Sequence, residues 1–327
     1  GKIGDININA NSLSLINNSD ISTSNALGKG DAGNINVKTT GDISIVGTTP
    51  QSTQVTTLKS NNSSISSDTN GRGNAGKITI DTQNRGKLLL LNGGSINSQI
   101  GPIAVGKGND IKILAQAIDL TNGSFISSDS VGKFDVKSNE NKKLAQELGE
   151  TELLSKIDTD NVGGKGDAGN IDIKTTGDIR ISSSNPQFDL DLDRQITAKS
   201  ILSSPLSSSI SSNTNGQGNA GGITIDTQNL GKLLLFGGAD ISSAIGPQAV
   251  GKGNGIKISA QAVDLIDGGT ISTSNAGGKG DAGNIRIDTI GDISLLSSLP
   301  RSTNIKYFSA INTDTFGQGN AGKITID

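Results

Sequence analysis

Short apolar stretches alternate with polar residues at a period of two along the chain, and they recur in groups of three. In the first group the apolar positions are Ile6 and Ile8, then Leu13 and Leu15, then Ile21. The groups that begin at Ile111 and Ile256 repeat these stretches at the same offsets. Alternation of this kind predicts β-strands that each bury one face. The pattern therefore predicts three short strands per repeat unit.

The repeat units are of three kinds, which follow one another in a fixed order. They contain "AQAIDL" or "AQAVDL", then "TTGDIRI" or "TIGDISL", then "TIDTQNRGKLLLL" or "TIDTQNLGKLLLF". The first strand of each unit is expected to begin at Ile6, Ile35, Ile78, Ile111, Ile171, Ile223, Ile256, Ile285 and Ile324. Strands with two inward residues cannot bury their apolar face alone, so each must stack in parallel on the next unit. The sequence predicts an all-β parallel β-helix, or solenoid, with eight complete coils and the start of a ninth in a three-coil super-repeat.

A glycine pattern precedes most of these units. Gly28, Gly30 and Gly33 have the G-x-G-x-x-G spacing of dinucleotide-binding loops, and five further copies follow in the chain. A nucleotide site needs a helix at the last glycine. Here an alternating, strand-like stretch follows instead. We interpret the pattern as a structural turn used once per coil, with glycine and Asn or Asp at corners that need a positive φ.

Composition limits the possible functions. The chain has no His, Cys, Met or Trp, aromatic residues make up 2%, and the net charge is −3. These values predict a thin aliphatic core with outward Asn, Ser, Thr, Asp and Lys in water, no nucleic-acid partner, no cofactor and no thiolate metal site. The absence of His and Cys also removes the familiar nucleophile–base pairs, so we expect no enzymatic activity.

The wording of the repeats resembles a known family. "GNAGKITI" at residues 73–80 and 319–326, followed by "L-x-L" and "xISS", is similar to the repeat region of filamentous-haemagglutinin-like exoproteins, especially the cyanobacterial ones. The resemblance implies a right-handed β-helix that is secreted by two-partner secretion through an outer-membrane transporter of a Gram-negative-type bacterium. It also implies a role in adhesion at the cell surface, with glycans or proteins of other surfaces as partners. We expect residues 1–327 to be one β-helix segment of a longer protein or fibre.

Two insertions interrupt the spacing of the units. Residues 134–161 contain the helix-like stretch 138–158, with Leu144/Leu148 and Leu153/Ile157 as i, i+4 pairs. Two interpretations stay open for this segment: a helical flap that packs its leucines on the rod, or a docking element for a neighbouring molecule.

The second insertion, residues 182–204, is an acidic loop. Asp189, Asp191 and Asp193 alternate, so they would share one face of an extended strand and could contact a hard cation or a cationic sugar. A solvated loop edge is the simpler interpretation. Together with Arg180 and Arg194 these residues are the best candidates for a sugar-cleaving site, and Tyr307 beside Phe308 is the only tyrosine available as a platform.

Three further aspartates, Asp31, Asp167 and Asp281, lie in the glycine turns. They occur in every third coil, about 14 Å apart, so we expect no shared calcium ions. The function expected from the sequence is a structural or adhesive rod of a surface adhesin or extracellular fibre. The alternatives are a filament subunit that stacks end to end with copies of itself and a carbohydrate-binding or carbohydrate-cleaving β-helix.

Overall fold

All regular elements in the described part of the chain are β-strands. The computed structural model describes residues 3–25, 28–47, 63–101, 104–130, 164–183, 207–297 and 308–327. Within these ranges the strands form three sheets, A, B and C, of nine, eight and eight strands. No helix in these ranges is long and apolar enough to cross a membrane.

The three sheets take their strands in rotation, so that each coil of the chain adds one strand to each sheet. Sheet A contains β1 (Ile6–Ala10), β4 (Ile35–Thr39), β7 (Ile78–Asp81), β10 (Ile111–Ala115), β13 (Ile171–Thr175), β16 (Ile223–Asp226), β19 (Ile256–Ala260), β22 (Ile285–Thr289) and β25 (Ile324–Ile326). Sheet B contains β2 (Leu13–Ile16), β5 (Ile43–Val46), β8 (Leu88–Leu91), β11 (Ile118–Thr121), β14 (Ile179–Ser182), β17 (Leu233–Phe236), β20 (Val263–Ile266) and β23 (Ile293–Leu296). Sheet C contains β3 (Asp20–Ser22), β6 (Ser64–Ser66), β9 (Ser95–Asn97), β12 (Phe125–Ser127), β15 (Ser209–Ser211), β18 (Asp240–Ser242), β21 (Thr270–Ser272) and β24 (Ala310–Asn312).

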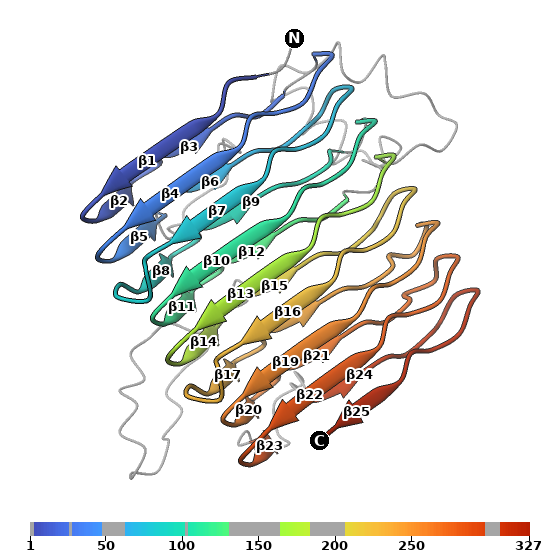
Figure 1. Ribbon diagram of the computed structural model, residues 1–327. Coiled ribbons are helices and arrows are strands. Elements are labelled where there is room, and N and C mark those ends of the chain that lie inside the picture. The colour runs from blue at the N-terminus through green and yellow to red at the C-terminus, as the bar shows by residue number, and fades with distance from the viewer. Residues whose placement is uncertain are drawn as a thin grey trace, which may run out of the picture.

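Each strand pairs in parallel with the strand one coil further along the chain. Ile6 pairs with Ile35 in sheet A, Leu13 with Ile43 in sheet B and Ile21 with Ile65 in sheet C. Figure 1 shows the resulting stack of coils. The parallel β-helix is thereby confirmed for the described residues, with eight complete coils and the first strand of a ninth, about 40 Å in length. The nine predicted first residues are the first residues of the sheet A strands.

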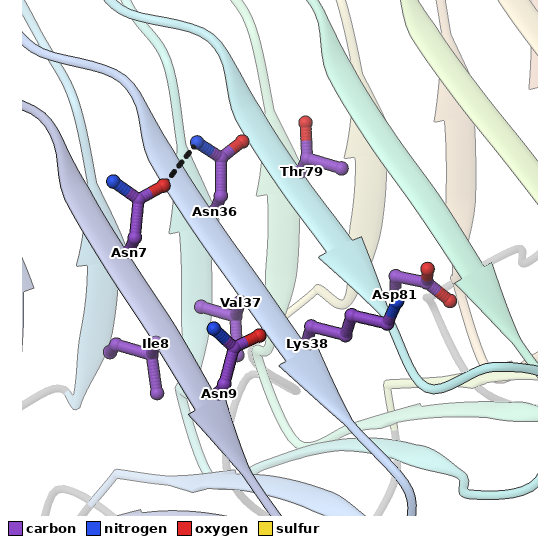
Figure 2. A pocket seen from close by; sticks show the side chains of 8 residues that line it. All are labelled: Asn7, Ile8, Asn9, Asn36, Val37, Lys38, Thr79 and Asp81. Carbon is purple, nitrogen blue, oxygen red and sulfur yellow. Dashed lines mark hydrogen bonds between the residues drawn. The ribbon is translucent and has the colours of Figure 1, made fainter.

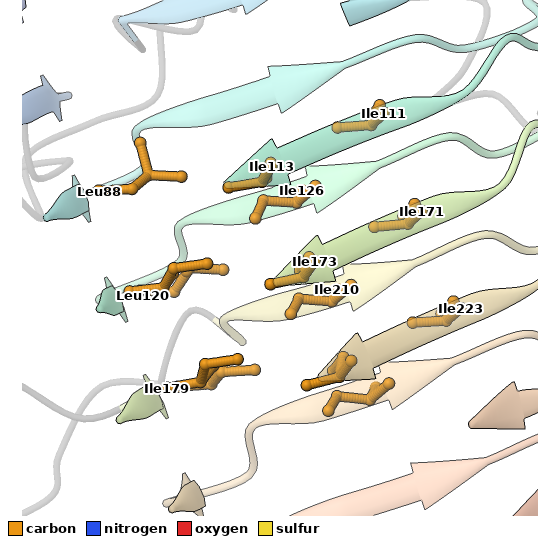
Figure 3. Packing of buried hydrophobic residues seen from close by; sticks show 14 of the residues in the cluster. Leu88, Ile111, Ile113, Leu120, Ile126, Ile171, Ile173, Ile179, Ile210 and Ile223 are labelled. Atoms are coloured by element: carbon orange, nitrogen blue, oxygen red, sulfur yellow. The ribbon is translucent and has the colours of Figure 1, made fainter. Parts of the chain in front are cut away.

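The core consists of columns of aliphatic side chains that run along the axis. Ile111, Ile171 and Ile223 follow one another in sheet A, and each is at most 1% exposed. Figure 3 shows these columns in the middle of the stack, where leucines and isoleucines of sheet B face those of sheets A and C. Burial of one such side chain contributes about 1.5–3 kcal/mol, so the stability of the rod is spread along its length.

The expectation that outward-type Ser and Thr residues all remain in water is wrong at several positions of the coil, for example Thr39, Ser63 and Thr69. One position is buried in every complete coil, and we call it the buried hydroxyl column. Eight hydroxyl residues, two positions after the central isoleucine of each sheet C strand, are buried: Thr23, Ser67, Ser98, Ser128, Ser212, Ser243, Thr273 and Thr313. They point to the same side as the isoleucine because side chains alternate along an extended chain. The coil has a narrow corner here, which small side chains can fill.

The two predicted insertions lie almost entirely outside the described residues. The helix-like segment 134–161 lies entirely outside the described residues. The acidic segment 182–204 is described only at Ser182, which ends β14, and at the buried Ser183.

Candidate functional site

The glycine turns, which carry the most conspicuous sequence pattern, are the corners between sheet C and the next strand of sheet A. The middle glycine has a positive φ, for example 133° at Gly30 and 146° at Gly73. The third glycine lies against the coil below, since a Cβ on Gly76 would stand 1.9 Å from the carbonyl oxygen of Gly33. A strand, and not a helix, follows each turn, so the structural interpretation of the pattern is confirmed.

The aspartates of these turns hold the next coil. Oδ1 of Asp31 accepts a hydrogen bond from the backbone N–H of Asn74 at 2.8 Å, and Asp167 and Asp281 do the same for Asn219 and Asn320. These carboxylates therefore bind main chain. The described residues contain no group of three or more acidic side chains that could hold a metal ion.

The buried hydroxyl column binds the same turns from the inside. Ser212 Oγ donates to the carbonyl of Gly169 at 2.6 Å and accepts from the N–H of Gly221 at 3.1 Å. Ser67 makes the equivalent bonds to Gly33 and Gly76. The turn is thus held by hydroxyls inside the coil and by Asn or Asp oxygens outside it. The sequence signal was present, because Ser or Thr stands at this inward position in all eight units.

The outer face of sheet A carries charged residues in register. Lys174 Nζ lies 3.8 Å from Asp226 on the next strand, and Arg286 lies 2.7 Å from both Asp288 and Asp327. Such exposed pairs contribute little to stability. They keep a flat, hydrated surface of alternating charge.

A shallow hollow lies on this face near the first coils. Figure 2 shows that it is lined by polar side chains from β1, β4 and β7, together with two aliphatic residues. Asn36 Nδ2 donates to Asn7 Oδ1 at 2.9 Å across two strands. The lining contains no aromatic side chain, and its acidic residue, Asp81, is a single carboxylate. The hollow offers hydrogen bonds, but it lacks the two carboxylates that glycoside hydrolysis requires.

Three carboxylates on the outer face of sheet C are half-buried, which the sequence analysis did not predict. Burial raises the pKa of Asp68 to about 6, although Oδ1 of Asp68 accepts the N–H of Gln99 at 2.8 Å. Burial likewise raises the pKa of Asp240 to about 6, against a hydrogen bond from Thr270. Asp129 has its pKa raised by burial too, while Asn213 N–H and Ser211 Oγ donate to it.

These three residues are not brought together as a catalytic set. Asp68, Asp129 and Asp240 belong to the second, fourth and sixth coils, so about 10 Å of axis separates each from the next. Each is bonded to main chain or hydroxyl groups of the coil that follows. The raised pKa values of these three carboxylates are a consequence of packing on sheet C.

Of the residues predicted from the sequence for a sugar-cleaving site, only Arg180 and Phe308 lie within the described ranges. Asp189, Asp191, Asp193 and Arg194 lie outside the described residues, as does Tyr307. Arg180 is an outward residue of β14 and lies 3.2 Å from Asp178. Phe308 is 67% exposed.

Comparison with known proteins finds no matching family model, no matching curated protein and no matching solved structure. The class defined by the chain's own architecture is therefore the parallel β-helix repeat protein.

Proposed function

We propose that the chain is a segment of the structural rod of a secreted surface adhesin or extracellular fibre, with no chemistry of its own. The observation that carries this proposal is the unbroken parallel pairing of sheet A from β1 to β25. A stack of this kind extends by adding coils, and each coil contacts only its neighbours. An architecture of this kind therefore gives an extended rod whose length depends on the number of coils.

The use of the polar side chains supports a scaffold role. The turn residues that could do chemistry, such as Asp31 and Ser67, bind backbone groups of the adjacent turns. A hydrogen bond of this kind stabilises the fold by about 1 kcal/mol. These groups are therefore engaged in holding coil to coil.

The proposal that the chain is exported and acts in adhesion is based on its sequence. Their support is the resemblance of the "GNAGKITI" repeats to filamentous-haemagglutinin-like exoproteins and the absence of cysteine, which suits an extracellular repeat protein. On this proposal the chain passes an outer-membrane transporter during export. Its flat, hydrated faces then meet glycans or proteins of another surface.

Immunogold electron microscopy of the source cells, with antibodies raised against this chain, tests the proposal. We expect gold particles outside the outer membrane, along thin unbranched extensions, on intact cells. Labelling that requires lysis of the cells would contradict a surface role. Incubation of the purified chain with a panel of polysaccharides is the second arm, and release of new reducing ends would contradict the absence of chemistry.

A further inference from the structure

The outer face of sheet B differs from the other outer faces by its apolar residues. In each strand of this sheet the first and third residues point into the core and the second and fourth point outward. We call the sixteen outward residues the sheet B face: Ser14, Ile16, Ser44, Val46, Leu89, Leu91, Asp119, Thr121, Arg180, Ser182, Leu234, Phe236, Asp264, Ile266, Ser294 and Leu296. The fourth position is apolar in six of the eight strands, and the runs "LLLL" and "LLLF" of β8 and β17 add Leu89 and Leu234 at the second.

The core does not require these outward side chains. Leu88 and Leu90 already fill the two inward positions of β8 and are fully buried, whereas Leu89 and Leu91 are half-buried on the outside. On the outer face of sheet A, the only apolar outward residue in the described strands is Leu114. An apolar column of this length on one face of a solenoid indicates a surface that is covered by another element.

The pattern of the sheet B face is self-complementary about its centre. The centre lies between β11 and β14, where Asp119 and Arg180 pair in register. Counting outward from that point, Leu89 of β8 corresponds to Leu234 of β17, and Val46 of β5 corresponds to Ile266 of β20. The outermost strands, β2 and β23, carry Ile16 and Leu296. Apolar residues therefore correspond to apolar residues, and Asp119 corresponds to the basic Arg180. The second acidic residue of the face, Asp264, corresponds to the polar Ser44.

We propose that a second copy of this chain packs on the sheet B face, with the two rods antiparallel and related by a two-fold axis that runs along the strands between β11 and β14. Rotation about this axis turns the sheet over and brings each strand opposite its counterpart, while the position along the strand is kept. Leu89 then faces Leu234 of the second copy, and Asp119 faces Arg180. Such an isologous contact is the commonest way in which identical chains associate.

A parallel arrangement of the two rods does not give this match. A two-fold axis along the rod would set each strand opposite its own copy, so that the two Asp119 residues would share one level and the two Arg180 residues the next. It would also exchange the two outward positions, which places Ile16 over Ser14. Charge repulsion and the mismatch of apolar with polar positions both oppose that arrangement.

The size of the face sets the expected strength. Eight strands about 4.8 Å apart, each about 13 Å long across four residues, give roughly 500 Å² per copy. Interfaces with about 1,000 Å² in total belong to the weak class. A weak contact becomes effective when it repeats along aligned rods. The inference goes beyond the proposed function because it names a lateral partner, and a monomeric rod could still serve as a scaffold.

Sedimentation equilibrium of the full chain, from about 1 µM to about 1 mM, tests whether the pairing exists. We expect a concentration-dependent dimer whose dissociation constant rises about tenfold or more on Leu89→Glu, because a charge would face Leu234. Leu114→Glu on sheet A is the matched control and should leave the dimer unchanged. A chain that stays monomeric throughout would overturn the proposal, as would equal effects of the two variants. Circular dichroism of each variant shows that the coil stack is intact.

A cross-linking experiment tests the orientation without relying on a disruptive variant. The chain contains no cysteine, so each introduced thiol is the only one. Ser44→Cys and Asp264→Cys lie on β5 and β20, which face each other in the antiparallel pair. A short bismaleimide should join a Ser44→Cys chain to an Asp264→Cys chain, and neither variant to itself. Self-linking of Ser44→Cys would indicate parallel rods and overturn the proposal. The absence of a link would show that no second copy lies on the sheet B face, and it would also overturn the proposal. The pair Asn36→Cys and Lys257→Cys, at the same levels of sheet A, is the background control.

Discussion

The Oδ1 atom of Asp31 accepts a hydrogen bond from the backbone N–H of Asn74, 2.8 Å away in the next coil. Asn74 in turn accepts from the N–H of Lys107 at 2.9 Å, one coil further along. The side-chain oxygens of Asp31 and Asn74 therefore both point along the axis toward the following coil. The amide of Asn and the carboxylate of Asp serve equally here, because only an acceptor oxygen is required.

We expect Asp31→Ala to lower the free energy of unfolding by about 1 kcal/mol, because the Asn74 N–H loses its acceptor. Asp31→Asn keeps an oxygen at the same place and should be nearly neutral. Urea unfolding followed by circular dichroism measures both. An equal loss in the two variants would show that the negative charge, and not the acceptor, is what matters.

The third glycine of each turn tolerates no side chain. A Cβ at Gly76 would stand 1.9 Å from the carbonyl oxygen of Gly33, so Gly76→Ala must push two coils apart and should cost about 3 kcal/mol or more. Gly4→Ala is the matched control, since nothing lies within 4 Å of its Cβ position. Thermal unfolding compares the two variants. Similar melting temperatures would mean that the coils separate at little cost.

The strand positions were predictable because inward aliphatic residues repeat at fixed offsets. Ile111 and Ile256 begin strands where the spacing predicts them. The buried hydroxyl column was not predicted, because Ser and Thr were assumed to face water, although Ser212 has the same parity as Ile210. The partial burial of Asp68 was not predicted either, because the solvent exposure of a residue on an outer face depends on packing between coils.

The buried hydroxyls give a second test of the turn. Ser212→Ala leaves the carbonyl of Gly169 and the N–H of Gly221 without their partner, and an unsatisfied buried group costs about 1–3 kcal/mol. Ser212→Thr restores the hydroxyl and should recover most of the loss, since Thr273 occupies the equivalent place two coils away and donates to Gly283 at 2.6 Å. Guanidinium unfolding measures the difference. No recovery with Thr would point to the volume of the corner as the controlling factor.

The half-buried carboxylates of sheet C predict a rod that becomes more stable as the pH falls below neutrality. The pKa of Asp240 is about 6 in the folded chain, against 3.8 for an ordinary aspartate. Between these two values the folded state binds more protons than the unfolded state, so the free energy of unfolding rises as the pH falls from about 7 toward 4. Asp68 acts in the same direction. For each residue the penalty at pH 7 is at most about 3 kcal/mol, which is the shift converted at about 1.36 kcal/mol per unit.

Asp240→Asn removes this penalty while keeping an acceptor for the Thr270 hydroxyl, which donates to Asp240 Oδ1 at 2.6 Å. We therefore expect the variant to be more stable than the parent chain at pH 7 and equal to it near pH 4, so that its stability changes less with pH. Asp172→Asn, at an exposed outward position of sheet A, is the control and should follow the parent chain. Urea unfolding at a series of pH values measures all three proteins. A parent chain that loses stability between pH 7 and pH 5 would show that other groups outweigh these carboxylates. A variant that is less stable at pH 7 would show that the ionised Asp240 strengthens the contact with Thr270 by more than its burial costs.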